Sequence, residues 1–294
     1  MSTAARLRST VASLDRSRVA LYTVLLALVA FYLAPLESGF MTAFKTPDGF
    51  RTTTPFAPPP AGEFTISAWG TAFERLSTGL LNSALMAVPA TVLSALFGSL
   101  AAYGLTNLSW RGQLGVLVLF VAGVFIPYQA VLVPLTQFWS FVDIGGRIPL
   151  AIVADNEGLI NLSITHVAYG IPICTVLFRS YYATIDDEML EAARLDGASA
   201  ATIYRRIILP LSIPIFAVTL IYQFTQIWND LLFAIVLVSN PSNQVVTVAL
   251  NQLQGSFVQQ FNLQMAGAFV AALPTLVVYV LFGEQFAKGV AGDS

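Results

Sequence analysis

The sequence predicts an all-α, polytopic membrane protein with six transmembrane helices, and three observations support this fold class. Hydrophobic residues make up 56% of the 294 positions and charged residues only 10%, against about 25% charged in soluble proteins. The mean hydropathy is +0.73. A chain this apolar has more apolar surface than a single core in water could bury. Six windows of about 20 mostly apolar residues, each long enough to cross a bilayer, are spread along the chain. Membrane lipid is therefore the expected surroundings of most of the chain.

The six windows follow one another with polar connections between them. They cover residues 19–36, 80–105, 113–135, 159–178, 209–238 and 265–286. The first window has the basic flank of a signal peptide, but no small-residue cleavage site follows it, so we expect a retained anchor. Residues 64–75, ahead of the second window, are expected to form a short interfacial helix with Trp69 and Phe73 one turn apart.

The sequence shows no internal repeat of fixed period and no segment polar enough to be a second domain. We therefore predict one transmembrane domain over residues 19–287. It would lie between a cytoplasmic segment, residues 1–18, and a cytoplasmic tail, residues 288–294.

The basic residues predict the orientation, because cytoplasmic loops retain Lys and Arg. With both termini inside, four of the 14 Lys and Arg residues fall on the outer side and the other ten inside. The outer four are Lys45, Arg51, Arg75 and Arg147. We predict a multi-pass protein of the cell membrane with both termini in the cytoplasm.

The composition excludes several classes of function. A formal net charge of −2 leaves no basic surface for a nucleic acid. One histidine and one cysteine cannot assemble a zinc or haem site from the usual ligands. The chain has two lysines, Lys45 and Lys288, and neither belongs to a Gly-x-x-x-x-Gly-Lys phosphate loop. We expect neither a bound cofactor nor an enzymatic activity on this chain.

The connection between the fourth and fifth windows, residues 179–208, is the most informative polar segment. Its local chemistry predicts a helix, a turn and a second helix. Thr184 and Asp187 fit a capping pair at the first N-terminus. Gly197 is placed to end that helix in a left-handed conformation, and Ser199 to cap the second helix.

Two plainer interpretations of this segment are a solvent-facing amphipathic linker and a DNA-binding helix-turn-helix. A DNA-recognition helix needs a packed three-helix core around it. Residues 179–208 are instead tethered between two membrane windows, so the DNA interpretation is disfavoured.

The same segment resembles the EAA loop of the membrane permease subunits of ABC importers. The matching positions are Glu191, Ala192, Ala193, Gly197, Ile207, Leu209 and Pro210, with Asp196 beside the glycine. In that family the loop forms a coupling helix that docks into a cleft on the ATPase subunit. The resemblance implies the ABC importer type I permease fold and a coupling role for these eight residues.

Further segments resemble the carbohydrate-importer branch, and within it the smaller maltose-type permease. They are Asn82-Ser83, Ala101-Ala102-Tyr103, Ile126-Pro127, Val133-Pro134-Leu135, Gly170-Ile171-Pro172, Trp228-Asn229-Asp230 and residues 283–292. Asp230 stands where glutamate is commoner in that branch. The resemblance implies separate ATPase subunits that bind ATP with Mg, a second permease subunit and an extracytoplasmic solute-binding protein.

The fifth window carries polar residues, which are costly in lipid and therefore candidates for function. Tyr222, Gln226 and Asn229 are spaced by four and three, which places them on one helix face, with Asp230 one turn from Gln226. A sugar path would use such amides and carboxylates around hydroxyls, and Tyr222 or Trp228 against a sugar ring. Contacts between helices, or an outer-end position near water for Asp230, explain the same residues equally well.

Other residues inside the windows have both a structural and a functional interpretation. His166 could relay protons in a secondary transporter, but packing is favoured because no chain of intramembrane carboxylates accompanies it. Pro127, Pro172, Pro214 and Pro274 are expected to kink their windows. Gly98, Gly104 and Gly123 are expected to allow close helix approach.

The residues and the resemblance together predict the permease subunit of an ATP-driven, binding-protein-dependent importer of a sugar or sugar-like solute. The rivals are an ABC permease for another small solute, an ion-coupled secondary transporter and a membrane-embedded enzyme. The enzyme is disfavoured because the sequence offers no nucleophile with a base and no metal-ligand set. The outer connection, residues 239–264, either contacts the binding protein or is simply solvated.

Overall fold

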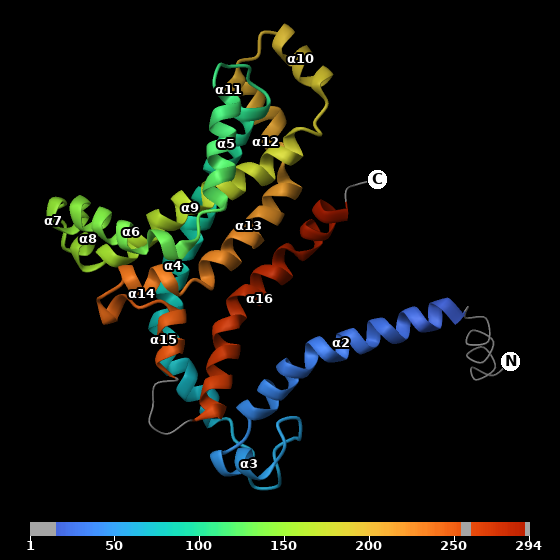
Figure 1. The fold of residues 1–294 in the computed structure, drawn as a ribbon, viewed down its shortest axis with the longest axis vertical. Helices are drawn as coiled ribbons and strands as arrows, with labels where there is room; N and C mark the ends of the chain where they lie inside the picture. Colours follow the sequence, from blue (N-terminus) through green and yellow to red (C-terminus); the bar gives the residue numbers. More distant parts are fainter. Residues whose placement is uncertain (1–15, 254–259, 292–294) are drawn as a thin grey trace. The chain divides into compact units, whose positions relative to one another are not determined.

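The computed structural model describes residues 16–253 and 260–291, and within these ranges the regular structure is helical without a β-strand (Figure 1). One isolated antiparallel bridge joins Lys45 to Phe64. The predicted all-α class is confirmed. The side chains of residues 285–294, and with them that of Lys288, lie outside the described part of the chain.

Within the described ranges, four single helices are long and apolar enough to cross a membrane. They are α2 (Arg16–Ala43), α4 (Ser67–Thr106), α9 (Glu157–Tyr182) and α16 (Phe261–Ala291). They correspond to the first, second, fourth and sixth predicted windows. Each exceeds the 20 or so residues that span the hydrocarbon of a bilayer.

The third predicted window is not one helix. It is divided between α5 (Gln113–Val124) and α6 (Tyr128–Val142), and the two halves of this broken span meet at 103°. Pro127 lies at the break with an extended backbone, ψ 135°. Proline has no N–H for the helical ladder and pushes the residue before it out of the helical region, so the predicted kink is a complete break.

The fifth window is broken twice. Residues Ala200–Leu211 and Ile213–Trp228 bend by 76° at Ser212, whose hydroxyl bonds back to the carbonyl of Ile208 at 2.5 Å. Such back-bonding by serine bends helices. The helix then ends at Trp228, so the expected helical continuation through Asp230 is wrong. If each bent pair counts as one crossing, the chain has six spans.

The expected interfacial helix over residues 64–75 is also wrong. Trp69 and Phe73 lie in the first turns of α4, which continues unbroken for 40 residues. No capping residue or proline separates these turns from the second window. Pro89, further along, is accommodated inside the helix, as proline often is in transmembrane helices.

Shorter helices complete the fold. They are α3 (Pro47–Thr52), α7 (Ile144–Arg147), α8 (Ala151–Asp155), α10 (Asp187–Leu195), α11 (Ala200–Ile203), the π-helical turn η1 (Tyr204–Ile208), α12 (Leu209–Leu211), α13 (Ile213–Trp228), α14 (Leu232–Leu237), the 3₁₀ turn η2 (Pro241–Asn243) and α15 (Val246–Gln252).

The chain divides into two compact units, Met1–Phe73 with Ser256–Phe269, and Glu74–Gly255 with Val270–Ser294. The first unit contains a cluster of aromatic rings whose neighbouring centroids are 5.0–6.2 Å apart. The cluster comprises Phe40, Phe44, Phe64, Trp69 and Phe269. The ammonium of the fully buried Lys45 donates to the carbonyl of Thr54 at 2.8 Å. Burial lowers the pKa of Lys45, and the carboxylate of Glu37 acts in the opposite direction.

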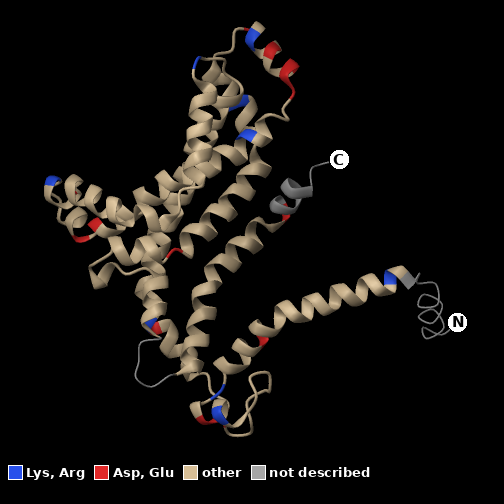
Figure 2. Ribbon diagram, viewed as in Figure 1, with Lys and Arg blue, Asp and Glu red and all other residues tan. Residues whose placement is uncertain are grey.

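The second unit contains both candidate functional regions. The helices α5 and α13 pack on α9, and α14 packs on both α6 and α9. Figure 2 shows the middle of α9 and α13 free of acidic and basic side chains, while charges gather on α10 and at helix ends. The charged helix α10 therefore lies in the chain between two helices, α9 and α13, whose middle parts have no acidic or basic side chains (Figure 2).

Two glycines allow the helices of this unit to cross closely. A Cβ on Gly98 of α4 would overlap the Cβ of Cys174 on α9, and one on Gly170 would lie 2.6 Å from the hydroxyl of Ser94. A Cβ added to Gly123 would lie 3.5 Å from Pro172, an ordinary van der Waals distance. The predicted close approach is confirmed at Gly98. At Gly104 it is wrong, because no described atom lies within 4 Å of an added Cβ.

Because Gly98 is tightly packed and Gly104 is not, substitution by alanine should have different effects on stability at these two positions of α4. Gly98→Ala should destabilise the protein by on the order of 1–3 kcal/mol, because the added methyl overpacks the α4–α9 crossing. Gly104→Ala should be neutral or stabilising by up to about 1 kcal/mol, from helix propensity. Thermal unfolding of the detergent-solubilised protein measures both. Equal melting temperatures for the two variants would contradict the crossing.

Candidate functional site

The first candidate region is the loop between α9 and α13, which begins with α10. Asp186 caps α10, since its carboxylate accepts the N–H of Glu188 at 2.9 Å. The expected capping by Thr184 is wrong, because that hydroxyl donates to the carbonyl of Tyr181. Asp186 lies directly before the helix with an extended backbone, which is the capping geometry.

The corner after α10 follows the sequence prediction. Gly197 has φ +82°, a left-handed conformation that favours glycine. Ser199 caps α11 by accepting the N–H of Thr202 at 3.2 Å. Both predictions are confirmed, and the loop is a capped helix followed by a rigid corner.

One face of α10 is anchored and the other is open. Leu190 is 1% exposed and Ala193 packs beside it. The core around them contains Tyr103, Cys174, Phe178, Tyr182, Ile203, Tyr204 and Ile208. On the other face Glu191 and Ala192 are exposed, and Leu195 is 89% exposed. The helix α10 therefore has one buried residue, Leu190, and an exposed face on its other side.

Buried hydroxyl groups join this loop to the helices below it. The hydroxyl of Ser99 on α4 lies 2.6 Å from that of Tyr182 and 2.8 Å from that of Tyr204. All three side chains are buried. A fully paired buried network of this kind rigidifies its surroundings, so the loop is fixed to α4 and α9.

Two hydrogen bonds to backbone add to this attachment. Arg194 donates to the carbonyl of Asn107 at 2.8 Å, and Tyr103 donates to that of Ala200 at 3.1 Å. The remaining resemblance-implied positions divide between the two faces. Ile207 packs on the buried core, whereas Asp196, Gly197, Leu209 and Pro210 are exposed.

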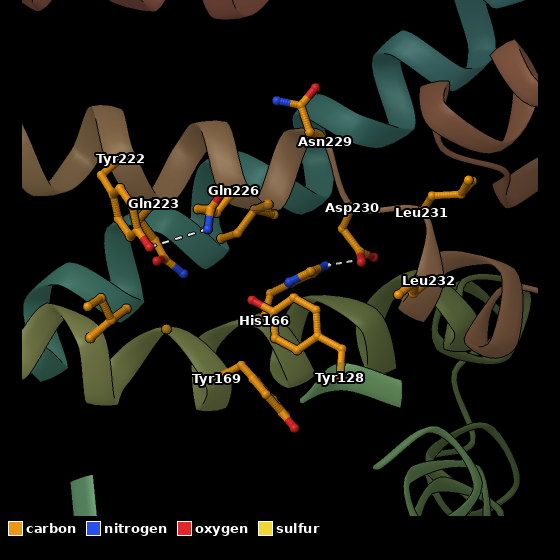
Figure 3. Close-up of a pocket in the computed structure, with 13 residues that line it drawn as sticks. Tyr128, His166, Tyr169, Tyr222, Gln223, Gln226, Asn229, Asp230, Leu231 and Leu232 are labelled. Carbon is orange, nitrogen blue, oxygen red and sulfur yellow. Dashed lines mark hydrogen bonds and ion pairs between the residues drawn. The ribbon is translucent and has the colours of Figure 1, made fainter. Parts of the chain in front are cut away.

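The second candidate region is a pocket of about 300 Å³ between α9, α13 and the break after Trp228 (Figure 3). Its lining includes Tyr128, His166, Tyr169, Gly170, Tyr222, Gln223, Gln226, Asn229 and Asp230. Gln226 donates to the hydroxyl of Tyr222 at 3.3 Å. The amide of Asn229 instead bonds back to Thr225 of its own helix and points away from His166 in the close-up.

The pocket contains a buried contact between His166 and Asp230 that the sequence analysis missed. Nε2 of His166 lies 3.4 Å from Oδ2 of Asp230, and the two side chains are 7% and 6% exposed. The same carboxylate accepts the N–H groups of Phe233 and Ala234 at 3.4 and 3.2 Å, and so caps α14. Asp230 is therefore a buried residue, which contradicts the outer-end alternative.

A second pocket of about 400 Å³ adjoins the first at the break between α5 and α6. The two share Tyr128, Tyr169, Ile173, Tyr222 and Gln226. Among the described lining residues there is no Lys or Arg. Hydroxyls, amides and aromatic faces around both pockets suit a neutral polyhydroxylated solute.

The chain matches the family of binding-protein-dependent transport system inner membrane components over residues 94–287. That match covers most of the second unit, including the loop that begins with α10 and both pockets. The chain belongs to this family of importer permeases.

Similar proteins agree with the assignment. The xylose/arabinose import permease protein XacI of Haloferax volcanii is 49% identical, over 97% of this chain and 96% of that one. The glucose import system permease protein GlcU of Saccharolobus solfataricus is 27% identical, over 92% and 93%. A crystal structure of a bacterial ABC transporter involved in import of the polysaccharide alginate matches with a TM-score of 0.68, 18% identity and coverage of 93% and 99%. The permease thus has the ABC importer fold and is a multi-pass transport component, not an enzyme.

The permease does not present every predicted path residue to its pocket. Trp228 is 3% exposed, donates to the carbonyl of Ala271 at 2.9 Å and stacks on Phe224, so the expected contact with a sugar ring is wrong for this residue. Tyr128 and Tyr169 are the aromatic residues of α6 and α9 that line the pocket. The sequence analysis missed Tyr128 as a pocket residue because it follows the break at Pro127.

We expect the Asp230 carboxylate to stabilise the break between α13 and α14, because it caps α14. Asp230→Ala should lower the stability by about 1–2 kcal/mol, since a helix cap is lost. The neighbouring Asn229→Ala is the matched control, because its amide bonds only within its own helix turn. Thermal unfolding in detergent measures the difference, and equal melting temperatures would exclude the capping role.

Proposed function

We propose that the permease imports a sugar or sugar-like solute as one of two membrane subunits of an ATP-driven complex. One observation carries this proposal: α10 is anchored through Leu190 on one face and open at Leu195 on the other. Such a helix fits a partner on its open face and transmits a displacement through its buried face. The similar permeases XacI and GlcU are named for the import of xylose or arabinose and of glucose.

The partner of the open face would be an ATPase subunit, which would hold ATP and Mg. The loop residues Glu191, Ala192, Ala193, Asp196 and Gly197 would form the docking surface and its corner. Closure of two ATPase subunits would draw this loop inward, and hydrolysis would release it. The two positions of the loop would favour different states of the membrane cavity, which is a population shift driven by ATP.

The displacement would reach the pocket through the close-packed helices. The network around Ser99 joins the loop to α4 and α9, and α9 carries His166 and Tyr169 in the pocket. A neutral solute would contact the hydroxyl of Tyr222 and the amide of Gln226, while Asp230 holds the shape of the break. The pocket lies where helices are interrupted, as in other membrane transporters.

The orientation follows from the partner. An ATPase is cytoplasmic, so the end of the second unit that carries α10 would face the cytoplasm. If each bent pair is one crossing, six alternating spans would put both termini in the cytoplasm, the orientation that the positive-inside count also favours. The connection over residues 239–264 would face outward, toward a solute-binding protein and beside a second permease subunit.

A charge on the open face of α10 should prevent coupling. In Leu195→Asp, ATPase subunits should no longer copurify with the tagged permease in mild detergent, and ATP-dependent sugar uptake should be lost. The fold should survive, because Leu195 is 89% exposed. Leu108→Asp, an exposed leucine on the neighbouring connection, is the control and should retain the ATPase.

The same assay separates the rival functions. If ATPase subunits copurify with the wild-type permease but no sugar is taken up, the permease imports another solute. Uptake that continues without any ATPase subunit, and collapses with a proton uncoupler, would replace the proposal with an ion-coupled transporter.

A further inference from the structure

A third hollow of the second unit lies at the end of α9 opposite α10. It has a volume of about 360 Å³ and is formed by α6, α8, the start of α9 and the segment after α14. The polar lining residues are Thr136, Ser140, Asp155, Glu157, Asn161, Ser239, Asn240 and Asn243. Among the described residues, none that line it is shared with the pocket around His166.

The side chain of Asn161 is the observation that points to a ligand. Asn161 is 6% exposed and lines the hollow. Its Oδ1 has no hydrogen-bond partner within the described part of the chain. A buried amide oxygen without a partner costs stability, and such a group calls for an explanation such as a functional role or a bound water or ion.

The walls around Asn161 are held in place by other amides. Asn243 donates to the carbonyl of Asp155 at 2.5 Å. Asn82 of α4 donates to the carbonyls of Ser242 and Gln244 at 2.8 and 3.0 Å. The turn after α14 is therefore fixed to both α8 and α4, so the hollow is formed before any ligand arrives.

The chemistry of the lining selects a class of ligand. The carboxylates of Asp155 and Glu157, the free amide of Asn161 and several hydroxyls offer acceptors and donors for hydroxyl groups. No basic side chain is present among the described lining residues, which disfavours an anion. No group of three His, Cys, Asp or Glu side chains able to hold a metal occurs in the described residues, which disfavours a tightly bound metal ion.

The hollow also lies in line with the pocket around His166. Asn161 and His166 are five residues apart on α9, or about 7–8 Å along the helix axis. Trp139, which lines the hollow, donates to the hydroxyl of Thr165 at 2.9 Å. Thr165 directly precedes His166, so this hydrogen bond links the lining of the hollow to the residue next to the pocket.

We infer that this hollow, with Asn161 at its base, is an entry site for a neutral polyhydroxylated solute, occupied before the pocket around His166. The inference rests on the proposed function for the direction of transport. It adds a second binding site, which solute leaving the binding protein would reach first.

Protection from thiol labelling tests binding directly. Ser140→Cys places a reactive thiol in the lining, and the native Cys174 is fully buried, so a maleimide should label the introduced thiol. In the complete importer in proteoliposomes without ATP, D-xylose should slow this labelling. It should not slow labelling of Ser77→Cys, an exposed position outside the hollow. No protection by D-xylose, or protection by CaCl₂ alone, would overturn the inference.

A second variant tests the role of Asn161. Asn161→Leu should remove the D-xylose protection of the thiol at position 140. It should also lower sugar transported per ATP hydrolysed by about fivefold, the effect of one lost hydrogen bond to a neutral ligand. Asn156→Leu is the control, because that amide bonds to the carbonyl of Ile152 and does not line the hollow.

The two assays separate this inference from the proposed function. A purely structural role for Asn161 would lower binding-protein-stimulated ATP hydrolysis and uptake together, and would leave protection by D-xylose intact, which overturns the inference. If the wild-type importer takes up no sugar from a panel that includes D-xylose, L-arabinose and D-glucose, the proposed cargo fails. The protection assay still decides the site.

Discussion

Inside a bilayer every backbone N–H and carbonyl needs a partner within the protein, and the pockets of this permease depend on how that demand is met at its helix breaks. At the second break the carboxylate of Asp230 accepts the first free N–H groups of α14. Its backbone carbonyl accepts the hydroxyl of Thr247 at 2.6 Å. A break paired in this way can stay open at membrane depth and leave room for a solute.

The same carboxylate introduces a buried negative charge, which would be costly without a partner. His166 supplies that partner from α9 at 3.4 Å. It is the only histidine of the chain, and Asp230 is the only charged residue between Arg206 and Glu284. One pair of side chains thus joins the cap of α14 to α9. The helix α9 also contributes Tyr169, Gly170 and Ile173 to the pocket.

That helix, α9, connects the regions in which function is placed. Its C-terminal end contributes Tyr182 to the hydroxyl network beneath the loop that begins with α10. Its middle lines the pocket around His166, and its N-terminal end contributes Asn161 to the third hollow. Gly98 and Gly170 leave room for α4, α9 and α13 to pack closely. The loop, the pocket and the hollow are therefore connected by packed contacts along one helix.

The sequence by itself determined the features that depend on neighbouring residues. Apolar windows predicted the four single spans. Gly197 and Ser199 predicted the corner after α10 and the cap of α11, because turn and cap chemistry depends on neighbouring residues. The spacing of Tyr222 and Gln226 placed both on one helix face, and both line the pocket. The family resemblance rested on the same kind of short-range pattern.

Only the tertiary structure decided the rest. The pairing of His166 with Asp230 joins positions 64 residues apart and requires a broken helix, which helical periodicity cannot express. Trp228 proved to be buried against α16, because which face of α13 meets a neighbour depends on packing. The free amide of Asn161 likewise became visible only when the walls from α6, α8 and η2 were in place around it. Local rules predict helices and corners, whereas sites form where distant segments meet.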